Sequence, residues 1–184
     1  MSSPTAANAK RIEKIARLRA HQSGRHRLQQ PVGIIGPGDG GPHETGAARQ
    51  VAAVLAQAGF AVICGGRGGV MAAASQGATE AGGIAIGVLP EEDACSANPY
   101  LSVAIPTGMG EMRNAIIARS SLCLVAIGGN MGTISEKALG LKWGKDVFAI
   151  FDDVHLPGAK VAECVDQLVD DVVDWLVGQI ERWE

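Results

Sequence analysis

The segment from Leu122 to Trp143 constrains the fold of this chain more than any other. An apolar run of strand length, Leu122–Ile127, is followed by a glycine-rich turn and then by a helical pattern from Ile134 to Trp143. Glycines let a ligand approach the backbone, and the free N–H groups of a helix N-terminus attract negative charge. The segment therefore predicts a phosphate-binding turn, with candidate residues Gly128, Gly129, Asn130, Met131, Gly132 and Thr133.

The same alternation of apolar runs and helical patterns extends along the chain. Strands are expected at 32–36, 60–64, 84–89, 102–105, 122–127 and 146–151, and helices at 9–28, 44–58, 70–81, 109–120, 134–143 and 161–180. Continuous apolar strands separated by helices are typical of a parallel sheet covered on both faces. With right-handed crossovers they predict a doubly wound, Rossmann-like α/β fold, whose ligands bind at the carboxyl ends of the strands.

The composition fits one aliphatic core in a reducing compartment. Hydrophobic residues make up 47% of the 184 residues, yet only 4% are aromatic. The four cysteines, Cys64, Cys95, Cys123 and Cys164, form no CxxC pair and are interpreted as buried thiols. The N-terminus has no apolar signal segment, and no apolar run is long enough to span a bilayer. We expect a cytoplasmic protein without membrane contact, and the scattered histidines indicate no metal site.

Charge divides the chain into two parts. Residues 1–30 carry seven Lys or Arg and one Glu, a net charge of +6 within a total of −3, so the remainder is strongly acidic. We therefore expect a basic N-terminal helical arm at 1–30 and a nucleotide-binding domain at 31–184. A basic arm could bind nucleic acid, but this one has no aromatic residue to stack on bases. We prefer a solvated helix, or one that packs on a partner subunit.

Two further glycine-containing turns are expected at the same edge of the sheet. Gly36 precedes the turn Pro37–Pro42, and Gly65–Gly69 holds four glycines around Arg67. A tight turn alone needs fewer glycines, so we favour contacts with phosphate or ribose by Gly36, Gly65, Gly66, Arg67 and Gly68. The dinucleotide spacing GxGxxG is incomplete and no P-loop occurs, so no cofactor is predicted.

Two charged residues flank the central strand, and each has a structural alternative. Arg113 begins the preceding helical pattern and is either a ligand contact, an exposed helix charge or an ion-pair partner of Glu111 or a later acid. Glu136 follows the glycine turn. The spacing of Thr133 and Glu136 matches a capping box, so Glu136 is either a functional carboxylate or the cap of its own helix.

Over residues 31–180 the chain resembles the LOG (Lonely Guy) family, whose members are often described as lysine decarboxylases. The resemblance rests on several short motifs rather than on one loop. They are Gly65–Met71, Gly77-Ala78, Gly82-Gly83, Gly87–Pro90, Arg113-Asn114 and Gly128–Glu136. Hydrolases of this family cleave the N-glycosidic bond of nucleoside 5′-monophosphates without a metal. The resemblance implies catalytic roles for Arg113 and Glu136, and phosphate binding by Gly129, Gly132 and Thr133.

Two positions depart from the family signature PGGxGTxxE. Gly128 replaces the proline and Asn130 replaces the second glycine of the signature's pair. With these two departures, the chain resembles the subgroup that includes molybdenum cofactor carrier proteins. Those proteins bind a phosphorylated pterin and are not regarded as enzymes. A nucleoside 5′-monophosphate phosphoribohydrolase is therefore the first expectation, and a cofactor carrier or nucleotide sensor is the alternative. The resemblance also implies a homo-oligomer, either a dimer or a tetramer.

Overall fold

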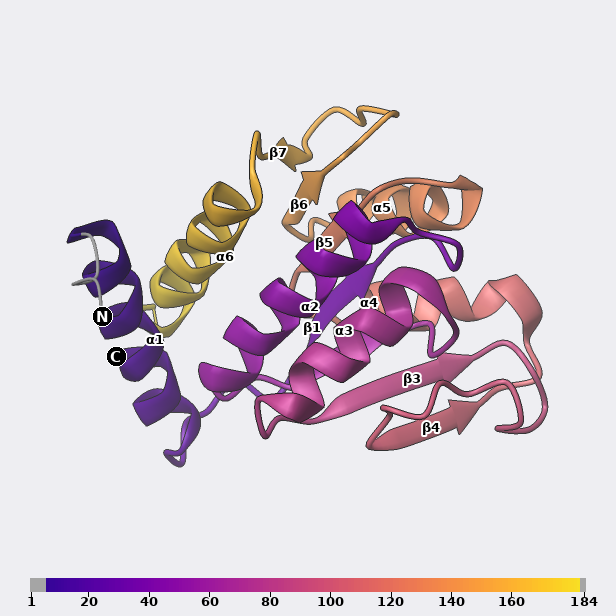
Figure 1. Cartoon of the computed structure of the whole chain (residues 1–184), viewed down its shortest axis with the longest axis horizontal. Helices are drawn as coiled ribbons and strands as arrows, with labels where there is room; N and C mark the ends of the chain where they lie inside the picture. Colours follow the sequence, from indigo (N-terminus) through magenta and orange to yellow (C-terminus); the bar gives the residue numbers. More distant parts are fainter. Residues whose placement is uncertain (1–5, 183–184) are drawn as a thin grey trace.

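The computed structural model describes residues 6–182 and contains a seven-stranded parallel sheet with helices on both faces (Figure 1). The strand order is β4-β3-β2-β1-β5-β6-β7, and every neighbouring pair is parallel. This confirms the doubly wound, Rossmann-like α/β fold. The strands are β1 Val32–Ile35, β2 Val62–Cys64, β3 Ala85–Leu89, β4 Val103–Pro106, β5 Leu124–Ile127, β6 Val147–Ile150 and β7 Lys160–Val161.

Residues alternate between two cores, one on each face of the sheet. Ile34 and Val125 pack in the core beneath α2, α3 and α6, whereas Ile35 and Leu124 pack in the core beneath α4 and α5. Successive side chains of a strand point to opposite faces, so a fully apolar strand supplies both cores. The helices are α1 Ala6–Gln22, α2 Pro42–Gln57, α3 Gly69–Glu80, η1 Gly110–Arg113, α4 Asn114–Ser120, α5 Met131–Lys142 and α6 Val165–Ile180.

Strands β2, β3 and β4 lie on one side of β1 in the sheet, and β5, β6 and β7 lie on its other side. From β1 the chain proceeds outward to β4, and it then returns to place β5 on the other side of β1. The loops after these two strands consequently diverge and leave a crevice at their carboxyl ends. The glycine turn that follows β5 therefore lies where a doubly wound sheet binds its ligand.

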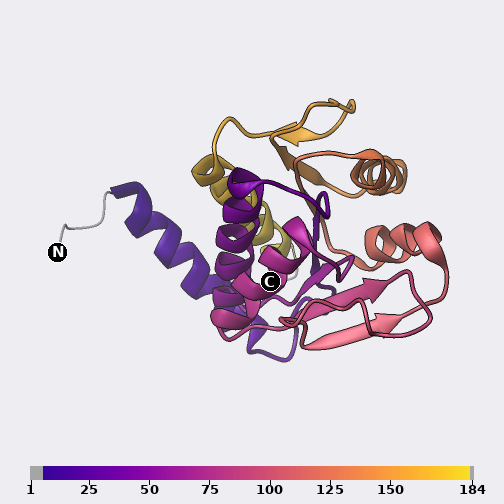
Figure 2. The same ribbon diagram turned by 45° about the vertical axis from the view of Figure 1, so that its right-hand side comes forward.

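Helix α1 lies outside the sheet layers and packs along α6 (Figures 1 and 2). Arg11 pairs with Asp166 and Asp170, and Lys14 pairs with Asp174. Further along, Arg17 pairs with Glu181, and the side chain of Leu18 is fully buried in the core. Cations of the basic arm thus face acids of the same chain, so the arm is not merely a solvated helix.

Several boundaries differ from the sequence-based expectations. The first helix ends at Gln22 instead of Leu28, because the Gln22 side chain turns back to bond the N–H and the carbonyl of Leu28, both at 2.9 Å. The helix expected at 109–120 is divided into a 3₁₀ turn, η1, and α4. The last helix begins at Val165, because Lys160 and Val161 pair with β6 as an additional strand.

The cysteine interpretation is correct for only half of the residues. Cys64 and Cys123 are buried free thiols, whereas Cys95 and Cys164 are exposed because they lie in the loop after β3 and at the start of α6. Burial raises the pKa of both Cys64 and Cys123. Within residues 6–182, no helix is long and apolar enough to cross a lipid bilayer.

Candidate functional site

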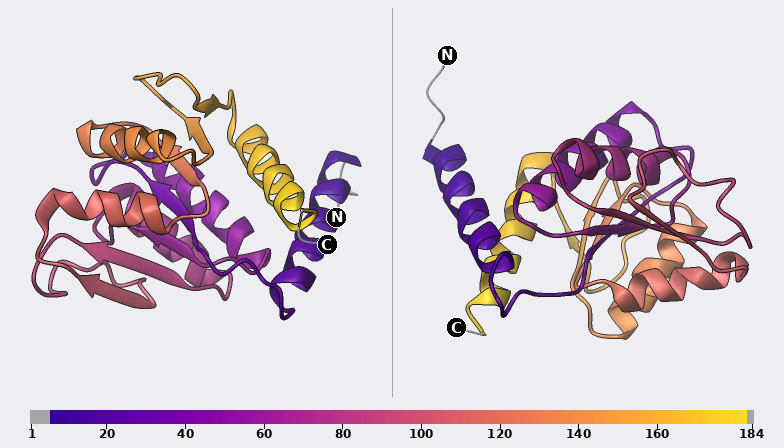
Figure 3. Two further views of the ribbon diagram at one scale, coloured as in Figure 1. Left: turned by 180° about the vertical axis from the view of Figure 1, so that it is seen from behind. Right: turned by 90° about the horizontal axis from the view of Figure 1, so that it is seen from below.

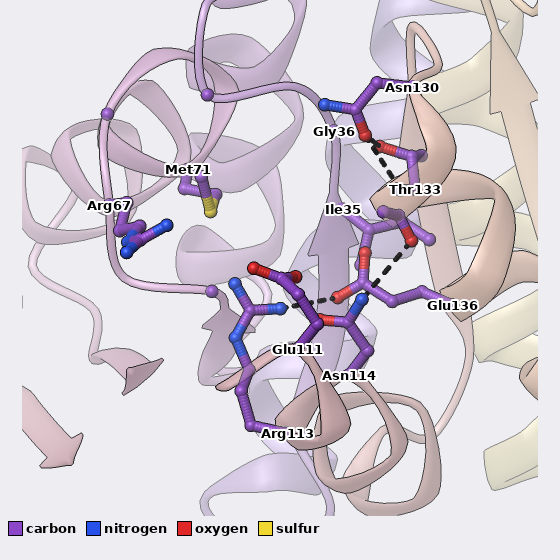
Figure 4. A pocket seen from close by; sticks show the side chains of 14 residues that line it. Ile35, Gly36, Arg67, Met71, Glu111, Arg113, Asn114, Asn130, Thr133 and Glu136 are labelled. Atoms are coloured by element: carbon purple, nitrogen blue, oxygen red, sulfur yellow. Dashed lines mark hydrogen bonds and ion pairs between the residues drawn. The ribbon is translucent and has the colours of Figure 1, made fainter. Parts of the chain in front are cut away.

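A cavity of about 330 Å³ opens at the carboxyl ends of β1 and β5, between the N-termini of α3 and α5 (Figure 4). Nine of the residues singled out from the sequence line it. They are Gly36, Gly65, Arg67, Gly68, Arg113, Asn130, Gly132, Thr133 and Glu136. Segments far apart in the sequence therefore meet at one place, and its volume is within the range of small-molecule sites, about 300–1,000 Å³.

The other four predicted residues lie nearby but do not line this cavity. Gly66 packs against Gly87 in β3, and Gly128 adopts a φ of 69° with its α-carbon facing the Glu44 carboxylate. A Cβ on Gly129 would have only Asp152 as a neighbour, at 3.9 Å. Met131 is 82% exposed and faces a second groove. Their predicted contact with a ligand stays a prediction.

Asn130 caps helix α5. Its Oδ1 accepts hydrogen bonds from the N–H of Thr133 at 3.0 Å and from the Thr133 hydroxyl at 3.2 Å. The helix supplies no carbonyl for the N–H groups of Met131 and Gly132, because first-turn donors have no preceding turn. The capping-box reading of Glu136 is thus wrong, since the cap lies three residues before Thr133 and Glu136 is free to face the cavity.

A second helix N-terminus, that of α3, opens onto the same cavity. Gly68 precedes the helix and lines the cavity together with Gly65 and Arg67. The N-terminus of α2, in contrast, is closed by its own chain, because Glu44 accepts the N–H of Gly41 at 2.6 Å. Two helix dipoles of the same sign therefore point toward the cavity, and both favour an anion there.

Arg113 and Glu136 face one another inside the cavity, 3.6 Å apart (Figure 4). Arg113 is only 6% exposed and Glu136 only 5%, so the alternative of an exposed helix charge is wrong for Arg113. The guanidinium lies against Gly65, where a Cβ would stand 2.7 Å from its terminal nitrogen. The buried Nε of Arg113 has no hydrogen-bond partner among the described residues.

Burial dominates the electrostatics of Glu136. Desolvation raises the pKa of Glu136 to about 8, against the opposing effect of Arg113 and with a further increase from Glu111. Glu136 is therefore mostly protonated at pH 7. The remaining charges that line the cavity are Arg67, Arg113 and Glu111, so the cavity carries a net positive charge that complements an anion.

Arg67 lies at the rim of the cavity and bonds the carboxylate of Glu91, its Nε at 2.9 Å. This contact with Arg67 lowers the pKa of Glu91. Arg67 is partly exposed, so surrounding water screens the pair and its stabilisation is small. A phosphate that enters the cavity can therefore compete with Glu91 for this guanidinium at little cost.

The cavity also contains five residues that the candidate set did not include, Ile35, Gly38, Met71, Glu111 and Asn114. Asn114 is the most informative, because its Nδ2 bonds the Ser135 hydroxyl at 2.9 Å while its buried Oδ1 has no partner in the described part of the chain. Asn114 follows Arg113 directly in the motif, so adjacency was the available signal. The sequence held no such signal for Glu111, apart from its position one turn before Asn114.

Behind the glycine turn, a buried ion pair holds α5 against the loop after β6. Lys137 Nζ donates to Asp152 at 2.5 Å and to the carbonyl of Val154 at 2.9 Å, and both charged side chains are almost fully buried. Phe151 adopts a φ of 54°, which turns the chain sharply and directs Asp152 inward. Sequence analysis did not identify this pair, which lies next to Glu136 in the chain but outside the cavity.

Comparison with known proteins gives related chains of similar size. The family model described as SLOG cluster4 family matches residues 29–171. An uncharacterized protein of Archaeoglobus fulgidus is 39% identical over 140 residues, which are 76% of this chain and 91% of that protein.

Two solved structures share both the fold and about a third of the residues. The molybdenum cofactor binding protein from Rippkaea orientalis is 32% identical with a TM-score of 0.75, covering 81% of this chain and 99% of that one. The molybdenum cofactor carrier protein from Chlamydomonas reinhardtii is 32% identical with a TM-score of 0.73, covering 82% of this chain and 99% of that one.

Proposed function

The chain belongs to the SLOG cluster4 family, and on this premise we propose that it binds a phosphorylated heterocyclic ligand of the molybdenum-cofactor type and carries it unchanged. The phosphate occupies the cavity between the N-termini of α3 and α5. Arg113 contacts the anion, and the heterocycle extends toward α4. The protein protects and delivers this ligand rather than cleaving it.

The observation that carries this proposal is the convergence of unused donors on one cavity. The N–H groups of Met131 and Gly132 have no carbonyl partner in α5, the buried guanidinium of Arg113 lines the cavity, and the N-terminus of α3 adds a second dipole. Phosphate provides several acceptor oxygens and negative charge, which match these donors. A neutral ligand would leave the net positive charge of the cavity without compensation.

The related structures support a pterin rather than an arbitrary phosphate. Two solved proteins that are 32% identical to this chain are a molybdenum cofactor binding protein and a molybdenum cofactor carrier protein. Each is matched over 99% of its own length, so this chain has the whole of their fold. The departures at Gly128 and Asn130 from the hydrolase signature point in the same direction.

The protonation of Glu136 favours binding over hydrolysis. Cleavage of an N-glycosidic bond develops positive charge on the ribose, which a carboxylate stabilises and a neutral carboxylic acid does not. Because the pKa of Glu136 is raised to about 8, most molecules lack this carboxylate at pH 7. A protonated Glu136 also removes the repulsion that a bound phosphate would otherwise meet.

Phosphoribohydrolase activity remains the second candidate, because Arg113 and Glu136 occupy the positions of the family's catalytic pair and lie 3.6 Å apart. If the chain is a hydrolase, the release of free base should increase between pH 7 and pH 9 as Glu136 loses its proton. Glu136→Gln should abolish that release at every pH.

One experiment separates the two candidates. The protein is incubated with GMP, AMP and 6-hydroxymethylpterin monophosphate, bound ligand is measured by equilibrium dialysis, and the recovered ligand is analysed by chromatography. The carrier proposal expects saturable binding and recovery of intact ligand. Free base in the recovered fraction would refute the carrier and identify a hydrolase.

A matched pair of variants tests the site itself. Arg113→Met should reduce phosphate-ligand affinity by about tenfold or more, because it removes a charged hydrogen bond. Arg25→Met removes the same charge at an exposed position outside the cavity and should leave affinity unchanged. Equal affinities in both variants would contradict the proposed role of Arg113.

A further inference from the structure

A second hollow continues directly from the anion cavity. It is a groove of about 890 Å³ between η1–α4 and α5, and it shares Glu111, Asn114, Asn130 and Gly132 with the first cavity. Its other walls are mainly apolar, formed by Met112, Ala115, Met131 and Leu139, with Ser135 as an additional polar residue. Figure 3 shows α4 and α5 side by side on the face of the sheet away from α2 and α3.

The two methionines of this groove are unusually open to solvent. Met112 is 72% exposed and Met131 is 82% exposed, although each follows a residue that lines the anion cavity. Flexible thioether side chains adapt their shape to a flat ring and make favourable sulfur–aromatic contacts. An apolar groove that opens from a charged cavity matches a ligand with a phosphate at one end and a ring system at the other.

Two hydrogen-bond acceptors stand at the junction of the cavity and the groove. Glu111 has no hydrogen-bond or ion-pair partner in the range 6–182, and Figure 4 shows its carboxylate directed into the cavity. The Ser135 hydroxyl donates to the carbonyl of Gly132 at 2.7 Å, so it must accept from the Nδ2 of Asn114. The Oδ1 of Asn114 is thereby fixed as an unused, buried acceptor.

We propose that the groove holds the ring system of the phosphorylated ligand, and that Glu111 and Asn114 select a ring edge with adjacent N–H donors. This inference rests on the proposed function, and it names the part of the ligand that determines specificity. The 2-amino-4-oxopyrimidine edge shared by guanine and pterins presents two neighbouring donors, which a carboxylate accepts together. Adenine presents an amino group next to an acceptor nitrogen. The lone pair of that nitrogen would be repelled by the carboxylate.

The test measures the affinity of four probes for the wild-type protein by equilibrium dialysis. Ribose 5-phosphate reports the anion cavity alone, AMP and GMP report the ring edge, and 6-hydroxymethylpterin monophosphate distinguishes a pterin from a purine carrying the same edge. GMP and the pterin should bind at least tenfold more tightly than AMP. If ribose 5-phosphate and all the other probes fail to bind, the proposed function is wrong. If ribose 5-phosphate binds and GMP is no tighter than AMP, only this inference is overturned.

The variant Glu111→Gln tests whether Glu111 recognises the ring edge of the ligand. The variant should lose about tenfold in affinity for GMP and the pterin, because one oxygen becomes a donor that faces the ring donors. The affinity for ribose 5-phosphate should not fall, because the substitution removes a negative charge from the wall of the anion cavity. Glu92→Gln is the matched control, because Glu92 is exposed and lies outside both hollows. An equal loss for all four probes in Glu111→Gln would refute selective reading of the ring edge.

Ala115→Leu tests whether the groove itself holds the ring. Ala115 lines the groove but not the anion cavity, so the larger side chain should reduce GMP affinity to that of ribose 5-phosphate. A second copy of the chain is the competing occupant of this apolar face. If Met112→Glu lowers the mass measured by light scattering and leaves GMP affinity unchanged, the groove is a contact between copies and the proposal is overturned.

Discussion

The protonation of Glu136 should be visible as a pH dependence of stability that Glu136→Gln removes. The pKa of Glu136 is raised from 4.5 to about 8 in the folded chain, mainly by burial. Between these pH values the folded protein binds a proton that the unfolded chain has lost, so the free energy of unfolding decreases as the pH rises. The decrease begins near pH 4.5 and is complete above about pH 8.

The magnitude follows from the difference between the two pKa values. About 3.5 pH units at about 1.4 kcal/mol each give an upper figure of roughly 5 kcal/mol. That is a large part of the total stability of an ordinary domain, about 5–15 kcal/mol. Glutamine has nearly the same shape but cannot lose a proton, so the variant should be similar to the wild type at pH 5 and more stable at pH 9.

Urea unfolding at several pH values between 5 and 9 measures this effect, and the difference between the two proteins is the informative quantity. Other titrating groups contribute equally to both proteins and cancel in that difference. Glu92→Gln, an exposed acid outside the cavity, serves as the control and should follow the wild type. If the free energies of unfolding of the wild type and of Glu136→Gln changed in parallel with pH, the buried carboxyl of Glu136 would not have a raised pKa. The conclusion that Glu136 is protonated at pH 7 would then be wrong.

Three further perturbations test the supports of the site. Gly65→Ala places a methyl group against the Arg113 guanidinium and should reduce ligand affinity about tenfold in dialysis; unchanged affinity would contradict the close packing. Asn130→Ala should cost about 1 kcal/mol in urea unfolding whereas Asn130→Asp should not, and equal losses would exclude the cap. Lys137→Met should cost about 3–5 kcal/mol, most of it recovered by adding Asp152→Leu; additive losses would exclude a coupled pair.

The sheet and the phosphate turn were predictable because their signals are local. An apolar run, a glycine-rich turn and a helical pattern follow one another within Leu122–Trp143, and each depends on residues only a few positions apart. The right-handed crossover rule then favours a parallel, doubly wound sheet, but the order of the strands comes from the structure. Glu136 follows this turn directly, whereas the role expected of Arg113, which precedes the strand, came from the resemblance to the LOG family.

The features that the sequence did not reveal depend on distant residues. Whether Glu136 caps its helix or faces the cavity was decided by Asn130, whose polar side chain took the cap position. The burial of Lys137 depends on Asp152, which approaches only because the chain turns at Phe151. The groove beside the cavity likewise depends on how α4 packs against α5, which no single periodic pattern specifies.

The pairing of α1 with α6 has a consequence for the order in which the protein folds during synthesis. The ion pairs of Arg11 and Arg17 join residues 155 and 164 positions apart in the chain. At about 5–20 residues per second, the ribosome needs roughly 8–30 s to make the partner helix after α1 has emerged. During that interval the basic helix has no acidic partner, and the side chain of Leu18 has no complete core to enter. Helix α1 thus docks only after α6 has been made, so conditions that slow translation should prolong the exposure of this segment to proteases and chaperones.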